Sequence, residues 1–566
     1  MYISGVYLKG YRNYSDAYVK LNKATLIIGA NDVGKTNLIH AIRLLLDKSF
    51  SELDLEPKNN DFHIDSSGNQ SDEIEITLHF SDVEEDAVLS RLAGSVSDAG
   101  RTVIRYVAYR TTLEYKIFIG FNVKHMEEVS SRFYLKYLNM RYIKSQRDLD
   151  KYINVEKRHL LKLAQDSRTQ EQIESDKGIL NELDDLLVGV NNKVKAISYV
   201  TTATDELNDE LKKLSYSNDR YNVQLDSGAI GTDQFIEKLE LSSNANGSKV
   251  MLGGDGFNNQ ILLALWKTKS VREHDVENEV VIYCIEEPEA HLYPHQQRKV
   301  SSYLINDLPG QSIVTTHSPQ IAVNYSPDSI VKIHSYNGSS EAASEGCSEC
   351  ISDAWDGMGY RMSIIPAEAF FANVVFLVEG PSEVLFYEQL ANTLKIDLDF
   401  YNISIISVDG VQFDVYKKIL DAFNISWVAR TDNDGSKVPK KQEWQYAGIN
   451  RALKLCNLAS KDNQQSEITL PELITAWGDY SPIVNRHGVY LSFSDLEGDL
   501  SNEFTLEVMD YSGKDDIDSA ANYLRSKKAI RMRELLKLYK QNLIKLESGD
   551  LARPLYHCER LARGEE

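Results

Sequence analysis

The stretch Gly29–Thr36, which reads G-A-N-D-V-G-K-T, constrains the fold of this chain more than any other segment. It fits the pattern G-x-x-x-x-G-K-[ST], a glycine-rich loop whose backbone N–H groups hold phosphate oxygens. The apolar run Ala24–Ile28 precedes the loop and the helix-like run Asn37–Leu46 follows it. This strand–loop–helix context predicts a site for ATP with Mg2+ or Mn2+. The expected nucleotide-binding residues are Gly29, Asn31, Gly34, Lys35, Thr36 and Asn37, with the Thr36 hydroxyl on the metal ion.

Two later runs of apolar residues end in side chains that suit the same site. The run Val280–Ile285 leads into Glu286 and Glu287. In a nucleotide hydrolase, the first acid after such a strand holds the metal ion and the next can polarise the attacking water. We therefore expect Glu286 to bind metal and Glu287 to act as the base. A further strand ends just before His317, whose imidazole can sense the γ-phosphate.

A second α/β segment begins near Val374. Three strand-like runs alternate with two helix-like runs between Val374 and Asp434, which predicts a βαβαβ unit with a parallel sheet and right-handed crossovers. Ligands of such sheets bind beyond the carboxyl ends of the strands. Glu379 ends the first strand, and Asp432 and Asp434 follow the third.

These carboxylates repel one another, so a cation is the natural occupant of the site. Mg2+ or Mn2+ prefers oxygen ligands, and one or two such ions can activate water for phosphodiester cleavage. We expect Glu379, Asp432 and Asp434 to hold the metal. Glu383, one helical turn after Glu379, is a further candidate, and Gly380 is expected to allow close backbone approach beside the acid.

The composition limits the class of protein. The 566 residues carry a net charge of −22, which argues against a protein that coats nucleic acid electrostatically. A local basic track remains in Ser526–Gln541, where six Lys and Arg residues face a single Glu. No long apolar run predicts a membrane helix, the start of the chain does not resemble a signal peptide, and five scattered cysteines do not form a disulfide framework. We therefore expect a cytoplasmic protein without a membrane partner.

The segment from about Leu149 to Leu214 changes to a helical pattern. Ile173, Leu180, Leu187 and Val194 are spaced by seven residues, which suits a helical hairpin or a short coiled coil. Two interpretations remain open at this point: the seam joins two copies of the chain, or it is buried within one chain.

The first part of the chain resembles the ATP-binding cassette ATPases of the SMC-like group. The resemblance rests on Gly29–Thr36, on the run E-E-P-E-A-H-L-Y-P from Glu286 and on T-T-H-S-P around His317. It implies that a signature loop from one subunit completes the site of its partner. Leu252–Gly256 lies where that loop is expected and contributes Gly254, but it lacks the usual Ser. ATP binding is therefore expected, while hydrolysis is left open.

The second part resembles the Toprim domain, through its Glu-Gly and Asp-x-Asp strand ends. A cassette followed by Toprim is the plan of the overcoming-lysogenization-defect (OLD) family, shared by the Gabija and retron-associated nucleases. Tyr142-Ile143 with Arg147-Asp148, and the run Glu368–Ala372, are also similar to the family. The resemblance implies metal-dependent DNA cleavage in antiphage defence, regulated by the cassette.

The resemblance also implies later acids and a lysine in the Toprim site. Glu497 within Asp495–Asp499 is the preferred acid and a metal ligand, and Lys527 or Lys528 is the candidate lysine that would stabilise charge on the phosphate.

The expected fold class is α/β: an SMC/ABC-type ATPase cassette with a helical insertion, followed by a Toprim domain with a Rossmann-like parallel βαβ sheet. The expected boundaries are 1–148 and 215–340 for the two parts of the cassette, 149–214 for the insertion, 341–372 for a linker, 373–545 for Toprim and 546–566 for a tail.

The sequence leaves several alternatives open. The substrate is expected to be DNA, but the same metal site could cleave RNA such as tRNA. A different class, an ATP-switched binding or assembly protein, would not need the intact carboxylates. A homodimer or a higher homo-oligomer is expected, and the further partner is a helicase, a reverse transcriptase with its RNA–DNA product, or none.

Overall fold

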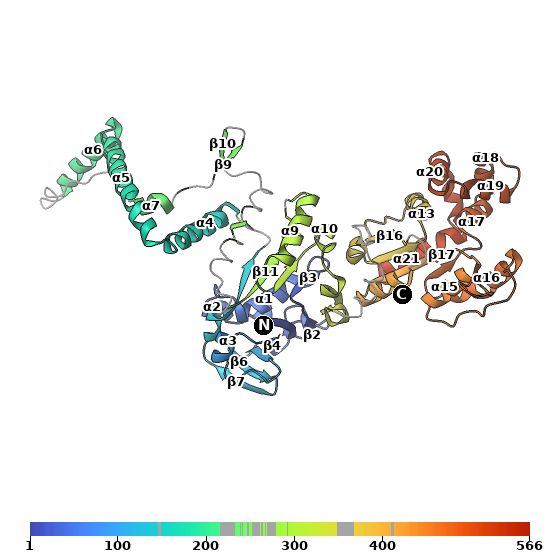
Figure 1. Cartoon of the computed structure of the whole chain (residues 1–566), viewed down its shortest axis with the longest axis horizontal. Helices are drawn as coiled ribbons and strands as arrows, with labels where there is room; N and C mark the ends of the chain where they lie inside the picture. The colour runs from blue at the N-terminus through green and yellow to red at the C-terminus, as the bar shows by residue number, and fades with distance from the viewer. Residues whose placement is uncertain are drawn as a thin grey trace. The chain divides into compact units, whose positions relative to one another are not determined.

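The computed structural model describes most of the chain (Figure 1). The described residues are 1–144, 149–214, 232–237, 239, 242–245, 248–251, 261, 264–265, 268, 279–290, 292–347, 367–408 and 413–565. The chain divides into two compact units. One consists of Met1–Ser145, Val276–Glu289 and Pro294–Glu566, and the other of Gln146–Asp275 with Ala290–Tyr293.

A six-stranded antiparallel sheet is built by the first 130 residues. Its order is β2-β1-β4-β5-β6-β7. The strands are β1 Tyr2–Tyr11, β2 Tyr14–Lys20, β4 Glu73–Ser81, β5 Thr102–Tyr109, β6 Tyr115–Asn122 and β7 His125–Val129. β1 and β2 form a hairpin and pair antiparallel from Gly5–Lys20 to Tyr11–Tyr14. The tip of this hairpin carries Arg12.

A second six-stranded sheet, in the order β14-β13-β3-β12-β11-β8, carries the nucleotide motifs. It consists of β3 Ala24–Ile28, β8 Leu138–Ile143, β11 Val280–Glu286, β12 Ser312–Thr315, β13 Ile330–Tyr336 and β14 Ser339–Ala342. All neighbouring strands pair in parallel except β13 with β14. Every residue of β11 is buried, as its continuous apolar run requires.

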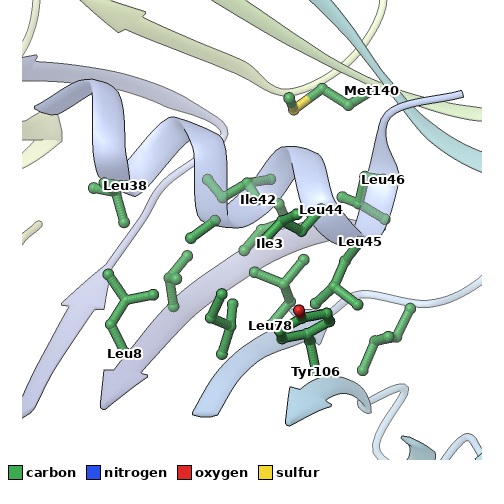
Figure 2. Close-up of a cluster of buried hydrophobic side chains, with 14 of the residues drawn as sticks. Ile3, Leu8, Leu38, Ile42, Leu44, Leu45, Leu46, Leu78, Tyr106 and Met140 are labelled. Atoms are coloured by element: carbon green, nitrogen blue, oxygen red, sulfur yellow. The ribbon is translucent and has the colours of Figure 1, made fainter. Parts of the chain in front are cut away.

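Helix α1, Lys35–Leu46, packs between these two sheets (Figure 2). Leu38, Ile42 and Leu45 are less than 1% exposed and share one helix face, at the spacing of a buried stripe. On the first sheet this face meets Ile3 and other apolar residues, while Met140 lies on the side of the second sheet. The shared core fixes the helix that begins with the P-loop lysine.

The C-terminal part folds around a four-stranded parallel sheet in the order β16-β15-β17-β20. The strands are β15 Val374–Val378, β16 Ile403–Ser407, β17 Ser426–Thr431 and β20 Val489–Leu491. Helices α13 Pro381–Leu394 and α14 Phe413–Ala422 connect the first three strands, so the predicted βαβαβ unit is confirmed. The sequence pattern missed β20 because three residues are too few to show a period.

The helices after β17 surround this sheet. They are α15 Ala447–Leu455, α16 Leu470–Asn485, α17 Leu496–Glu503, α18 Thr505–Ser512, α19 Ile517–Arg525, α20 Lys528–Tyr539 and α21 Arg553–Arg563. The stretch 546–566, expected as a tail, instead forms α21 and part of the core. Leu555 and Cys558 of α21 are fully buried, and the helix packs on β15 and β17. The buried apolar residues of α21 are interspersed with charged ones, so the composition of this stretch did not indicate that it belongs to the core.

The other unit contains three long helices, α4 Leu149–Asp166, α5 Gln170–Lys195 and α6 Ser198–Leu214. The seven-residue seam lies on α5. Its Ile173 is 40% exposed, and Leu180 and Leu187 are only partly buried. Within the described residues, the chain therefore covers this seam incompletely.

Among the described residues, no helix has both the length and the apolar character needed to span a bilayer.

Candidate active sites

The phosphate loop connects β3 to α1, as predicted. The Lys35 ammonium lies folded over the loop and donates to the carbonyl oxygens of Gly29 (2.8 Å) and Ala30 (2.6 Å). Burial lowers the pKa of Lys35, which the nearby acids oppose. Thr36 and Asn31 are exposed, so both can reach a bound nucleotide and its metal ion.

Glycine is required at two positions of this loop. Gly29 (φ +147°) and Gly34 (φ +103°) adopt backbone conformations that side chains disfavour. A Cβ atom would lie 2.4 Å from the Ile333 carbonyl oxygen at Gly29, and 2.3 Å from Asn13 Nδ2 at Gly34. The two glycines therefore let the loop lie against neighbouring strands while its N–H groups remain free for phosphate.

The tip of the β1–β2 hairpin supports the loop from the other sheet. Arg12 donates to Asn37 Oδ1 (2.8 Å) and to Asp61 Oδ1 (2.9 Å). Asn37 in turn donates to Asn13 Oδ1 (2.8 Å), and Tyr14 donates its hydroxyl to the Gly34 carbonyl oxygen (3.0 Å). Sequence reasoning missed Arg12 and Asn13. The signal in the sequence was that these two polar residues form the turn between β1 and β2, the two strands that precede β3 and the phosphate loop.

The acids after β11 lie beside the phosphate loop. Glu286 accepts a hydrogen bond from the Tyr142 hydroxyl (2.7 Å) on the neighbouring strand β8, and its other oxygen is buried without a donor. Glu287 follows with φ +46°, a left-handed conformation that turns it out of the strand. His317 Nε2 lies 3.5 Å from Glu287 Oε1. Burial lowers the pKa of His317, and the Lys35 charge lowers it further.

The expected signature loop Leu252–Gly256, with Gly254, lies outside the described residues, as do Arg147 and Asp148. The structure therefore gives no position for Gly254 relative to the nucleotide motifs.

Glu379 directly follows β15, and one of its carboxylate oxygens accepts three hydrogen bonds. Its Oε1 receives the Thr431 hydroxyl (2.7 Å) and the Asp432 backbone N–H (2.8 Å), both at the end of the adjacent strand β17. The Arg451 guanidinium of α15 also donates to this oxygen and lies 3.3 Å from Asp434 Oδ1. Glu379, Asp432 and Asp434 are thus brought to one edge of the sheet, together with an arginine that sequence reasoning missed because no motif marks it.

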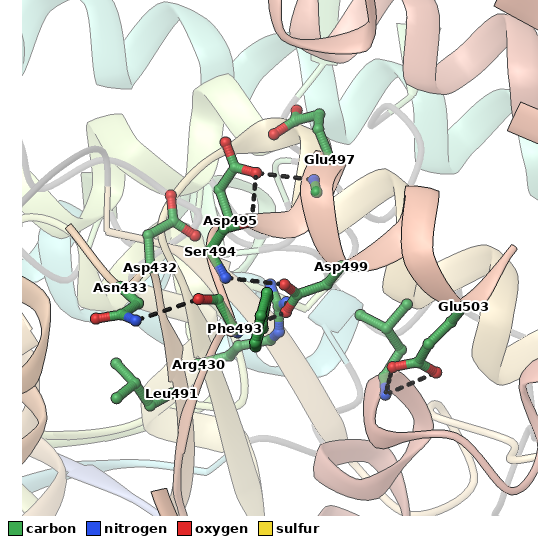
Figure 3. Close-up of polar contacts among 12 residues, drawn as sticks. Arg430, Asp432, Asn433, Leu491, Phe493, Ser494, Asp495, Glu497, Asp499 and Glu503 are labelled. Carbon is green, nitrogen blue, oxygen red and sulfur yellow. Dashed lines mark hydrogen bonds and ion pairs between the residues drawn. The ribbon is translucent and has the colours of Figure 1, made fainter. Parts of the chain in front are cut away.

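Glu497 enters the same edge from the first turn of α17. Its side chain is 1% exposed, and neither carboxylate oxygen has a hydrogen-bond donor. Asp432 Oδ1 is likewise buried without a donor. Figure 3 shows Asp432, Asp495 and Glu497 in a row at this edge. Burial raises the pKa of both Asp432 and Glu497, and the charge of Glu379 raises that of Asp432 further.

These orphaned oxygens fit a divalent cation. Within the described part of the chain, no group of three or more His, Cys, Asp or Glu side chains is arranged so that it could hold a metal ion without side-chain movement. Hard oxygen donors without protein partners are nevertheless the chemistry that Mg2+ or Mn2+ takes, and burying them unpaired is costly. Asp432, Glu497 and Glu379 are the residues that would hold such an ion.

Two further groups border this acidic edge. Glu383 is 4% exposed, and burial raises its pKa to about 7. Lys528 Nζ lies 4.0 Å from Glu497 Oε2. Burial alone would lower the pKa of Lys528, but the charges of Glu497 and its neighbours outweigh that and raise it. Lys527, the residue before α20, and Lys528 are both exposed, and Lys528 is the one whose ammonium approaches Glu497.

A buried ion pair holds the two sides of this edge together (Figure 3). Arg430 of β17 donates to Asp499 Oδ2 (2.7 Å), and the side chains are only 5% and 11% exposed. Asp499 also accepts from the N–H groups of Phe493 (3.1 Å) and Ser494 (3.0 Å). The pair therefore ties the segment after β20 to β17, two residues before Asp432.

Asp495 is engaged elsewhere. It accepts from Arg525 through Nε (2.6 Å) and Nη2 (2.8 Å), and from the N–H of Gly498 (2.8 Å) as a helix cap. The expectation that Gly380 allows a close backbone approach is wrong. Its φ of −156° is ordinary extended backbone, and a Cβ atom there would make only a normal contact with Glu383 at 3.4 Å.

Comparisons with known proteins match two parts of the chain to known domain families. Residues 1–160 and 130–322 match the AAA ATPase domain family, and residues 370–434 match the TOPRIM domain of overcoming lysogenization defect protein-like sequences. The chain is thus an ATPase of mixed α/β fold joined to an OLD-like TOPRIM domain, which confirms the fold class and the family resemblance predicted from sequence. Such domains use a nucleotide and a divalent metal ion in general.

More than half of the chain lies within the first match, and the chain belongs to the AAA ATPase domain family. It is also similar to the endonuclease GajA of Bacillus cereus (strain VD045), with 24% identity over 95% of each chain.

Two solved structures illustrate its similarity to SMC heads. One is an SmcHead bound to the C-winged helix domain of ScpA (18% identity, 60% of this chain and 97% of that chain, TM-score 0.38). Another is the SMC head domain from Thermotoga maritima (14% identity, 60% and 98%, TM-score 0.31). The fold assignment rests on the family matches and the strand order, not on these scores.

Proposed function

We propose that this protein is a metal-dependent endonuclease that cleaves DNA at the Toprim edge and is regulated by ATP at the cassette. The observation that carries the proposal is the set of buried carboxylate oxygens without donors at Asp432 and Glu497, beside Glu379. A binding module has no use for such costly groups, whereas a divalent cation needs them. The similarity to an endonuclease over 95% of the chain supports the same conclusion.

The reaction is hydrolysis of a phosphodiester, in which water adds to phosphorus and one P–O bond breaks. A bound Mg2+ or Mn2+ supplies the activation of water and the stabilisation of the leaving oxygen. Glu379, Asp432 and Glu497 would hold the ion, and Asp434 would offer a further oxygen donor after the same strand as Asp432. Lys528, paired with Glu497, offers a positive charge to the phosphate.

DNA reaches this edge along α20. Arg533, Lys537 and Lys540 are exposed on or just after this helix, which begins at Lys528. A row of cations that ends at the metal site suits a polyanionic backbone, although the whole chain is acidic.

At the cassette, Lys35 and Thr36 would bind the phosphates and metal ion of ATP, Glu286 would hold the metal ion, and Glu287 with His317 would act at the γ-phosphate. Two copies of the chain associate, and the incompletely covered seam of α5 supports a contribution from the helical unit. We place the protein in the cytoplasm and in defence against phage.

A plasmid cleavage assay tests the proposal. Supercoiled DNA is incubated with Mg2+ or Mn2+, with and without ATP, using the unaltered protein, Glu379→Gln and Lys35→Ala. We expect Glu379→Gln to lower cleavage by at least about 100-fold, while ATP binding is unchanged, because an essential metal ligand is removed. Lys35→Ala should remove only the response to ATP.

Equal cleavage by Glu379→Gln would overturn the assignment of the chemistry to Toprim. Cleavage of tRNA but not of plasmid would change the substrate to RNA. No cleavage of either, with ATP binding intact, would favour the switched binding protein.

A further inference from the structure

Arg451 contacts two of the carboxylates that are expected to hold the metal ion. Its Nη1 donates to Glu379 Oε1 and to the Thr431 hydroxyl (2.5 Å), and its Nη2 lies 3.3 Å from Asp434 Oδ1. The arginine side chain is 12% exposed, against 21% for Glu379 and 48% for Asp434. One guanidinium thus bridges Glu379, which follows β15, and Asp434, which follows β17.

These contacts leave Glu379 Oε1 no capacity for a cation. The oxygen already accepts three hydrogen bonds, from Thr431, from the Asp432 backbone and from Arg451. A carboxylate oxygen has about two lone-pair sites, so it cannot also ligate a metal ion. Of the three donors, the Asp432 backbone N–H is held at the end of β17, and the Thr431 hydroxyl sits on a short side chain of that strand. The long Arg451 side chain is therefore the donor with the most freedom to move.

The fold provides space for that movement. An open cleft of about 730 Å³ adjoins Arg451 and is lined by Asp434, Asn450, Lys454 and other polar residues. The guanidinium can therefore leave the carboxylates and remain hydrated, without entering an apolar core.

We propose that Arg451 is a resident counter-cation of the Toprim site, which a divalent metal ion must displace from Glu379 Oε1 and Asp434 Oδ1 before it can use these two oxygens as ligands. The proposal rests on the proposed function for the identity of the metal site, and it goes beyond that function by assigning a competitor to the metal. The arginine neutralises the acids while the metal is absent, and it raises the metal concentration at which the site fills.

Isothermal titration of the full chain with Mn2+ alone, without nucleotide, tests this competition. Arg451→Gln should bind Mn2+ about tenfold more tightly than the unaltered protein, because no charge-assisted hydrogen bonds need to be broken. Arg451→Lys keeps the positive charge but loses the paired N–H donors of the guanidinium, so its increase in Mn2+ affinity should be smaller. The matched control is Lys454→Gln, three residues further along α15, whose ammonium pairs with Asp414 (2.7 Å); its Mn2+ affinity should not change.

The outcomes separate the two proposals. Mn2+ binding by Arg451→Gln that is unchanged or weaker, in a variant whose far-UV circular dichroism matches the unaltered protein, would overturn the proposed competition. Glu379→Gln would still show separately whether the site holds metal. An equal increase in Mn2+ affinity in Arg451→Gln and Lys454→Gln would mean that net charge alone causes the effect, and it would also overturn the competition. Mn2+ binding that survives in Glu379→Gln would instead refute the metal site itself. Should Arg451→Gln fail to fold, the comparison of Arg451→Lys with the unaltered protein decides, since a gain is expected only from displacement.

Discussion

At the scale of single residues, one partly buried carboxyl of the C-terminal domain makes the stability of the fold depend on pH. Glu503 ends α17 and accepts the backbone N–H of Leu551 (3.3 Å) (Figure 3). Burial, together with the nearby Asp550 charge, raises its pKa to about 7. Because the pKa of Glu503 is higher in the folded state than in the unfolded state, protonation of Glu503 favours folding. This stabilisation is complete below the unfolded pKa of about 4.3 and is lost as the pH rises through 7.

Glu503→Gln should remove this loss, because the amide resembles the protonated acid and its oxygen can still accept from Leu551. Melting curves at pH 4.5 and pH 8 provide the measurement. We expect no difference at pH 4.5 and a melting temperature about 2–4 °C higher for the variant at pH 8, the effect being reduced by solvent because Glu503 is only half-buried. A variant that is less stable at pH 8 would show that the carboxylate is ionised and favourably paired.

At the scale of elements, two arginine–aspartate pairs fix the segment that follows β20. Arg430 joins it to β17 in a buried pair, whereas Arg525 joins it to α19 through side chains that are 34% and 19% exposed. Removing one partner of a buried pair leaves an uncompensated charge.

Arg430→Met should therefore lower the free energy of unfolding by about 3–5 kcal/mol, and Arg525→Met by about 1 kcal/mol or less. Urea unfolding followed by circular dichroism compares the two variants directly. Similar losses would mean that water reaches Arg430 and that β17 and the segment after β20 are held by their backbone hydrogen bonds instead.

At the scale of the whole molecule, the last helix completes the C-terminal domain. Leu555 and Cys558 are fully buried in its core. A chain that ends at Gly549 should lose the unfolding transition of this domain and keep ATP binding, whereas a chain that ends at Gly564 should match the full protein. The reason is that several buried apolar side chains are lost, at about 2–5 kcal/mol each. Calorimetry of the two shortened chains decides, and a cooperative transition in the shorter one would show that the sheet is stable without α21.

The parts of the fold that carry a period or a motif were predictable from sequence. The P-loop, the buried strand before Glu286 and the βαβαβ unit each combine a local pattern with fixed chemistry, so local residues suffice to define them. The short strand β20, the burial of α21 and the role of Arg451 depend on contacts between residues far apart in the chain. Arg451 lies 72 positions after Glu379, and no local spacing links them. The signature segment with Gly254 stays a prediction.

The place of α21 in the chain has a consequence for synthesis. The sheet that bears Glu379 is made of residues 374–491, but the helix that covers β15 and β17 comes from residues 553–563. During translation the ribosome must therefore release more than 60 further residues before this sheet can be covered, while the cassette strands up to β14 can pair much earlier. A nascent chain can therefore form the strands of its nucleotide site well before the sheet beside Glu379 is covered.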